Sequence, residues 1–176
     1  MKKFTSAMLA SMTLITSNLA QACDYNANIL PTAPVERFIL NADGTAVDKL
    51  TGLMWSRCTL GMQWDEKEQQ CIDADDNWFS WDEAIRDAEQ SEYASYYDWR
   101  VPNIKELASI VESACSRPAL NTEVFNNIHP SAQFHSATPA QAYQTQAWYV
   151  NQLGQVSAFN KTDVKRVLLV RKQNIL

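Results

Sequence analysis

The sequence of 176 residues predicts an α+β fold: a small antiparallel sheet, two helices, long loops and two disulfides. Three observations support this prediction. Short apolar segments separated by turn residues lie near both ends, two central segments carry helix-capping patterns, and four cysteines follow an export signal. Strands grouped before and after the helices, without strand–helix alternation, favour an antiparallel sheet with paired terminal strands.

The first 22 residues have the pattern of a secretory signal peptide. Lys2 and Lys3 precede an uncharged stretch of apolar and small residues that ends in Ala20-Gln21-Ala22. The apolar part is too short for a membrane span, and no later run reaches ~18 apolar residues. We therefore expect an exported protein without a membrane span, located in the periplasm, on the cell surface or outside the cell.

The charge of the remaining chain argues against nucleic acids and anionic membranes as partners. Without the two lysines of the signal, 13 Lys and Arg stand against 20 Asp and Glu, a net charge of −7. Both kinds of partner are bound through basic side chains that neutralise phosphates. We therefore expect no nucleic-acid partner.

All four cysteines remain after the predicted cleavage. In an oxidising compartment an even set predicts two disulfides, although four cysteines allow three connectivities. We favour Cys58 with Cys71 and Cys23 with Cys115, for which the loop-entropy model gives ~3 and ~4 to 5 kcal/mol. The alternative is a lipid on Cys23, the first residue after the cleavage site, which would leave an unpaired thiol among the other three.

The chain then divides into an arm and one domain. Residues 23–36 contain Pro31 and Pro34 and show no periodicity, which predicts an extended N-terminal arm. A single domain is expected over residues 37–172.

The domain is expected to begin with a strand meander. Gly44 and Gly52 mark its turns, and its three predicted strands cover residues 37–40, 45–48 and 53–57. Residues 58–78 are rich in Asp, Glu and Gln and predict a solvated loop.

Two capping patterns predict the helices. Ser80 precedes Glu83, and Asn103 precedes Glu106, with the spacing of a capping box. Apolar residues recur at helical spacing after each cap, and the second helix is expected to end before Pro118.

The last part of the domain is expected to be mostly irregular and then extended. Residues 121–146 predict a long loop region with one short strand near Phe134. A hairpin and a final strand follow, over residues 147–151, 155–159 and 166–171.

The sequence offers little for catalysis. Motifs of hydrolases, kinases, zinc proteases and redox dithiols do not occur in it. Only His129 and His135 could act as bases at neutral pH. A cysteine nucleophile would need a free thiol, which the export signal argues against. We therefore expect no enzymatic activity and no catalytic residue.

Calcium is the one cofactor that the acidic segment leaves open. Asp73, Asp75 and Asn77 imitate the first half of an EF-hand loop. However, Trp78 stands where that loop needs Gly, and Ala84 stands where it needs a bidentate Glu. We therefore expect a solvated acidic loop, no metal site and no cofactor.

Aromatic residues are the better candidates for ligand contact, because Trp faces are platforms for sugar rings and peptide anchors. Four tryptophans lie in predicted strands, a helix or a tight motif and are expected in the core: Trp55, Trp81, Trp99 and Trp148. Trp64 and Trp78 lie in the acidic loop and are candidates for exposed contacts. Asp98 and Arg100 could form an anion site, but a structural ion pair is the commoner role.

Several short motifs occur in one order along the chain. They are T-G-L-M-W at 51–55, W-D-E-A at 81–84, D-W-R-V-P at 98–102, K-E-L at 105–107, P-A-L-N at 118–121, A-W-Y-V-N at 147–151 and V-L-L-V-R at 167–171. Together they resemble the Lcl C-terminal domain family, named for the globular tail of a bacterial collagen-like adhesin. The resemblance implies a C-type-lectin-like fold, akin to that of formylglycine-generating and sulfatase-modifying enzymes, and a secreted or surface role in adhesion.

The chain departs from this family at the binding face that the resemblance implies. Family members usually carry F-W-S-S where this chain has F-H-S-A at 134–137, so His135 replaces a Trp. The charge of −7 argues against the sulfated glycosaminoglycans that the collagen-like adhesin is understood to engage. The candidate ligand-binding residues are Trp64, Trp78, Phe134, His135 and Tyr143.

We expect a non-enzymatic binding module that recognises a glycan or a protein through residues 121–146. One alternative is a structural or assembly subunit of a surface appendage or secretion system, which would use Trp64, Trp78 and the arm as contacts. Another is an enzyme related to the formylglycine-generating group. A homo-oligomer is open in each case.

Overall fold

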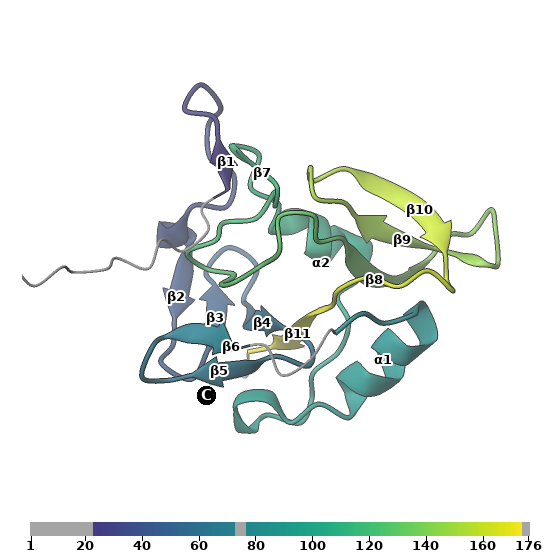
Figure 1. Ribbon diagram of the computed structural model, residues 1–176, viewed down its shortest axis with the longest axis horizontal. Helices are drawn as coiled ribbons and strands as arrows, with labels where there is room; N and C mark the ends of the chain where they lie inside the picture. Colours follow the sequence, from purple (N-terminus) through teal and green to yellow (C-terminus); the bar gives the residue numbers. More distant parts are fainter. Residues whose placement is uncertain (1–22, 73–76, 174–176) are drawn as a thin grey trace, which may run out of the picture.

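The computed structural model describes residues 23–72 and 77–173. The predicted signal peptide and the two aspartates of the EF-hand-like segment, Asp73 and Asp75, lie outside the described residues. Antiparallel strands, two α-helices and two disulfides make up the fold, which confirms the α+β class (Figure 1).

The larger sheet has four strands in the order β11-β4-β3-β2. They are β2 (Phe38–Leu40), β3 (Thr45–Asp48), β4 (Leu53–Thr59) and β11 (Leu168–Lys172). The predicted meander is thus present, and the last strand joins it. However, β11 pairs with β4, with Val170 opposite Trp55, so the first and last strands lie at opposite edges. β4 is buried along nearly all its length and needs a neighbour on both sides.

The smaller sheet has the order β10-β9-β8 and contains the predicted hairpin. Its strands are β8 (Phe134–Pro139), β9 (Gln146–Val150) and β10 (Val156–Asn160). Helix α2 packs against β8 and β9, and helix α1 packs against β8. A parallel bridge between Phe134 and Arg166 links this sheet to the segment that leads into β11.

Both predicted helix caps are present. Helix α1 (Trp81–Glu89) begins after Ser80, whose N–H donates to Glu83 Oε2 at 2.9 Å. Helix α2 (Ile104–Ser109) begins after Asn103, whose Oδ1 accepts the N–H of Glu106 at 3.0 Å. These bonds satisfy backbone donors that the first helical turn leaves free, which explains why the helices start at these residues.

The arm is attached to the domain at several points. Strand β1 (Asp24–Tyr25) pairs with β7 (Cys115–Ser116), and the predicted disulfide Cys23–Cys115 joins their ends. The buried Glu112 carboxylate accepts the N–H groups of Thr32 at 3.0 Å and Ala33 at 2.8 Å. A 3-10 turn, η1 (Val35–Arg37), leads into β2. Because the Cys23 sulfur lies in a disulfide, it is not available for the alternative lipid linkage.

A hairpin replaces the loop predicted for residues 58–78. Strands β5 (Gln63–Asp65) and β6 (Gln70–Ile72) pair antiparallel, and the predicted disulfide Cys58–Cys71 anchors them to β4. The disulfide expected to hold this segment is present, but the loop prediction was wrong because these short strands lack the alternating apolar pattern that predicts a strand.

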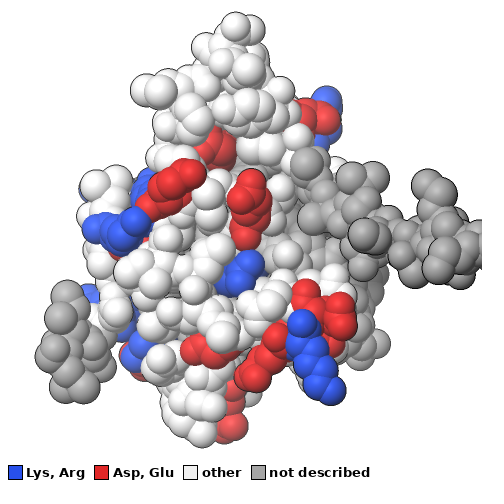
Figure 2. Space-filling model, turned by 90° about the vertical axis from the view of Figure 1, so that its left-hand side faces the viewer, with Lys and Arg blue, Asp and Glu red and all other residues white. Residues whose placement is uncertain are grey.

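Charged side chains are scattered over the face that Figure 2 draws. Figure 2 shows acidic and basic residues interspersed between broad uncharged areas, with no continuous basic patch on that face. The protruding lobe at its top corresponds to the top of Figure 1, where β1 and the following turn extend from the domain.

Candidate functional site

Two of the predicted contact residues lie inside the domain. Phe134 and His135, at the start of β8, are each only 2% exposed. His135 Nε2 lies 2.8 Å from the Phe79 carbonyl oxygen, and burial lowers the pKa of this imidazole. Neither side chain offers a surface to a ligand, so their placement does not support the prediction that they bind one.

Trp64 lies half-buried beside a groove of about 490 Å³ between the β5–β6 hairpin and the 3-10 turn η2 (Tyr93–Ser95). Its indole N–H donates to the Ala42 carbonyl at 2.7 Å, and the Arg57 guanidinium lies 4.4 Å from its ring centroid. The Tyr93 hydroxyl donates to the Gly44 carbonyl at 2.9 Å. Both aromatic residues of this groove are thus engaged in hydrogen bonds that fasten the hairpin and η2 to the turn between β2 and β3.

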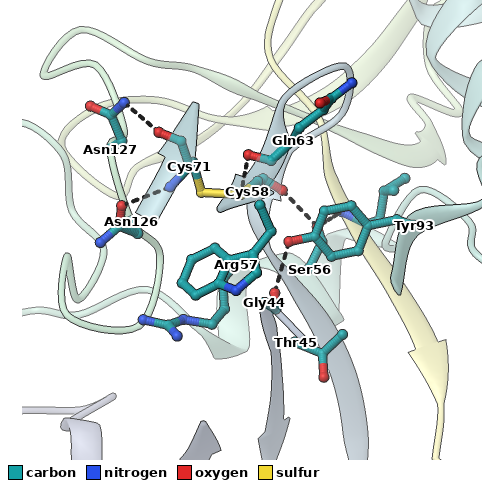
Figure 3. Close-up of a disulfide and its surroundings, with 12 residues drawn as sticks. Gly44, Thr45, Ser56, Arg57, Cys58, Gln63, Cys71, Tyr93, Asn126 and Asn127 are labelled. Carbon is teal, nitrogen blue, oxygen red and sulfur yellow. Dashed lines mark hydrogen bonds between the residues drawn. A yellow bond between two sulfur atoms is a disulfide. The ribbon is translucent and has the colours of Figure 1, made fainter. Parts of the chain in front are cut away.

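The disulfide next to this groove is also tied to the long loop region. Asn126 Oδ1 accepts the N–H of Cys71 at 3.1 Å, and Asn127 Nδ2 donates to the Cys71 carbonyl at 2.9 Å (Figure 3). The buried Arg57 guanidinium donates to the carbonyls of Val124 and Glu123. These bonds hold part of residues 121–146, the loop region predicted to recognise a ligand.

Trp78 is half-buried and close to a cation of its own domain. The Arg166 guanidinium carbon lies 4.8 Å from the Trp78 ring centroid. This distance is typical of a cation–π contact, so one ring face is covered by the protein itself.

Tyr143 lies on a second groove with two aromatic residues. This groove of about 500 Å³ lies between the segment that follows β8 and the faces of β9 and β10. Its lining is uncharged and consists of Thr138, Pro139, Ala140, Gln141, Ala142, Tyr143, Trp148 and Ala158. The Tyr143 side chain is 62% exposed, and Trp148 is half-buried. Among the described residues, no hydrogen bond engages the Tyr143 hydroxyl, the Trp148 indole N–H or the Gln141 amide.

Trp148 was the residue that sequence reasoning missed, since it was assigned to the core. In the β9–β10 ladder, Trp148 lies opposite Ala158. Directly opposite residues share one face of a sheet, and the small Ala158 side chain leaves the Trp ring uncovered on that side. The predicted hairpin places the small Ala158 opposite Trp148, and this was the signal that could have identified Trp148 as an accessible residue.

The D-W-R segment has a structural role. Asp98 accepts two bonds from Arg171, at 2.5 and 3.1 Å, and Arg100 donates two bonds of 2.7 Å to Glu106. Trp99 between them is buried and donates its indole N–H to the Tyr93 carbonyl. The hydrogen bonds from Arg171 keep the pKa of the Asp98 carboxyl below its ordinary value. Asp98 and Arg100 therefore form two separate ion pairs, which join the D-W-R segment to β11 and to α2.

Thiol chemistry and metal binding find little support in the described part of the chain. All four cysteines lie in disulfides, so a thiol nucleophile would first require reduction of a disulfide. Within residues 23–72 and 77–173, no three His, Cys, Asp or Glu side chains gather as a metal site would need. No helix in the same ranges is long and apolar enough to span a bilayer.

These features define a disulfide-stabilised α+β domain with an open, uncharged aromatic groove. The family model of the Lcl C-terminal domain matches residues 44–171, most of the chain, and the chain belongs to this family. A search of curated proteins finds no match. The match to the family model confirms the resemblance seen in the motifs and indicates a surface-associated domain. The two disulfides are consistent with export, and the C-type-lectin-like fold stays a prediction.

Proposed function

We propose that this domain is a non-enzymatic binding module that holds an uncharged sugar ring in the groove lined by Tyr143 and Trp148. The observation that carries the proposal is the groove itself, which joins two accessible aromatic rings with no charged lining residue. Aromatic rings that combine an apolar face with a polar end are favoured at recognition surfaces.

The chemistry of the groove suits a sugar. The apolar C–H face of a pyranose stacks on an aromatic ring, while its hydroxyls need hydrogen-bond partners at the rim. The Trp148 indole N–H, the Tyr143 hydroxyl and the Gln141 amide supply donors and acceptors there. A polyanionic glycan would instead need cations, and the lining contains no Lys or Arg.

The test compares two tyrosines of similar exposure. Tyr143, in the groove, is 62% exposed, and Tyr97, outside it, is 69% exposed. We expect an array of neutral oligosaccharides to identify a ligand, with Tyr143→Ala weakening its binding about tenfold and Tyr97→Ala leaving it unchanged. NMR titration of the folded protein with that oligosaccharide should shift the Trp148 indole signal.

Two results would contradict the proposal. One is no binding to any neutral oligosaccharide at millimolar concentration while the protein is folded. The other is an equal loss of binding in Tyr143→Ala and Tyr97→Ala, because only Tyr143 lines the groove.

A second candidate function is that of an assembly subunit, which one observation favours. The turn after β1 protrudes from the domain in Figure 1, and its Leu30 is 85% exposed. An exposed large apolar residue on a protrusion can anchor a protein partner. Native mass measurement of complexes from cells that express wild type or Leu30→Ser would decide, since loss of a defined complex in the variant is expected for this function alone.

A further inference from the structure

The outer edge of β10 has backbone hydrogen-bonding groups that the fold does not use. β10 is an edge strand, and Figure 1 shows it at the outside of the molecule. The hydrogen bond from the Lys161 N–H to the Thr145 carbonyl, 2.8 Å, shows which residues of β10 form hydrogen-bonded pairs with β9. Odd-numbered residues therefore bond to β9, and Val156 and Ala158 direct their N–H and C=O groups outward. None of the described residues forms a hydrogen bond with the N–H or C=O groups of Val156 and Ala158.

β10 also lacks the features that usually protect an edge strand. Proteins shield such edges with charged side chains, proline, bulges or a covering segment. The sequence of β10, Val-Ser-Ala-Phe-Asn, has no charge and no proline, and it pairs with β9 without a register shift. Apolar side chains surround this edge, since Leu153, Val156 and Phe159 are 43%, 43% and 46% exposed. The edge is therefore suited to pairing with another strand.

We propose that β10 pairs antiparallel with β10 of a second copy of this chain, so that two three-stranded sheets become one six-stranded sheet. The favoured register places Val156 opposite Ala158 of the second copy, because it uses all four outward groups of each strand. The same register places Lys161 beside Leu153 of the second copy. Because β10 carries no charge, self-pairing brings no like charges together.

A second copy fits this edge better than an unrelated strand because the pairing is self-complementary. In a two-fold arrangement each contact occurs twice, with the same patch on both copies. The axis passes between the two Ser157 residues and runs perpendicular to the sheet. Both copies then present the Tyr143–Trp148 groove on the same side of the joined sheet, although the pairing does not depend on what that groove binds.

A cysteine placed on the axis tests this register. Ser157 bonds to β9, so relative to the outer edge it occupies a non-hydrogen-bonded position, where facing Cα atoms lie about 4.5 Å apart. That distance is within the span of a disulfide. Ser157→Cys should therefore form a disulfide-linked dimer under mild oxidation. Gln155→Cys is the matched control, because the same register sets the two copies of Gln155 four residues apart, beyond disulfide reach.

A proline on the free edge tests the pairing by another route. Ala158→Pro removes an outward N–H and leaves the bonds to β9 intact, whereas Ala158→Ser keeps that N–H. Analytical ultracentrifugation of the wild type should show a monomer–dimer equilibrium. We expect Ala158→Pro to raise the dimer dissociation constant about tenfold or more and Ala158→Ser to leave it unchanged.

Three outcomes would overturn the proposal. The first is a wild-type protein that stays monomeric at about 1 mM. The second is equal crosslinking of Ser157→Cys and Gln155→Cys. The third is a dimer that a folded Ala158→Pro variant does not weaken, which would place the contact elsewhere. If Ala158→Pro does not fold, the cysteine comparison still decides.

Discussion

The ion pair between Arg37 and Asp48 gives a sharp prediction about the stability of the larger sheet. Asp48 is fully buried, and the Arg37 side chain is 9% exposed. Arg37 Nε donates to Asp48 Oδ1 at 2.8 Å, while the Leu50 N–H and the Thr51 hydroxyl donate to the same carboxylate at 3.0 and 2.7 Å. Asp48→Ala therefore leaves a buried guanidinium without its carboxylate and removes the acceptor of the turn before β4.

The expected loss follows from that burial. Removal of one partner of a buried ion pair costs about 3 to 5 kcal/mol, because the other charge stays desolvated. For a domain of this size, about 4 kcal/mol lowers the melting temperature by roughly 8 to 16 °C. Urea unfolding and calorimetry of Asp48→Ala at pH 7 measure both quantities.

A double variant separates the unpaired charge from the lost packing. Arg37→Met combined with Asp48→Ala removes both charges, so we expect it to be less destabilised than Asp48→Ala alone. A loss below about 1 kcal/mol in Asp48→Ala, or a double variant whose loss equals the sum of both single losses, would refute the reasoning.

The same pair predicts a dependence on acid. Burial by itself raises the pKa of Asp48, but hydrogen bonds from Arg37, Thr51 and Leu50 outweigh it and leave the pKa below its ordinary value. A lowered carboxyl pKa stabilises the folded state above the unfolded pKa of about 3.9, and that contribution is lost as the pH falls through the folded value. When the pH is lowered below about 4, the free energy of unfolding should therefore fall less in Asp48→Ala than in the wild type.

Two further predictions concern other buried groups. Because burial lowers the pKa of His135, the unfolded chain takes up a proton below pH ~6.5 while the folded chain does not. Stability should therefore fall as the pH drops from about 7 to 5.5 in the wild type and in His129→Gln, and fall less in His135→Phe; equal slopes in urea titrations would contradict this. Glu112→Gln replaces one carboxylate oxygen, which accepts N–H groups of the arm, by an NH₂ donor. The amides of Thr32 and Ala33 should therefore exchange hydrogen about tenfold faster. Unchanged exchange would show that Glu112 does not hold the arm.

The helices and the hairpin could be predicted because their signals are local. Ser80 and Asn103 cap helices through side chains that reach only three residues along the chain. The β9–β10 hairpin follows from its turn at Gly154 and its strand pattern. The disulfide Cys58–Cys71 was favoured for the short loop that it closes, and the structure contains it.

The candidate site was only partly within reach of sequence reasoning. Tyr143 was predicted as a contact residue and lies on the groove, but Trp148 was assigned to the core. Whether an aromatic ring is covered depends on the side chains packed against it. The neighbour of Trp148 on the adjacent strand is the small Ala158, which leaves the ring accessible. His135 was expected near a binding face and is buried against the Phe79 carbonyl instead.

The sequence by itself determined the α+β class, both helix starts and the family, because each depends on residue types at short, fixed spacings. It favoured the two disulfides without excluding the other connectivities, because Cys23 and Cys115 are 92 residues apart. The tertiary structure decided the rest. Only the packed chain shows that β11 pairs with β4, that Asp98 and Arg100 bind different partners, and that an edge of β10 stays free. These features depend on segments far apart in the chain, and the burial and ordering of distant groups, rather than local propensity, select among such pairings.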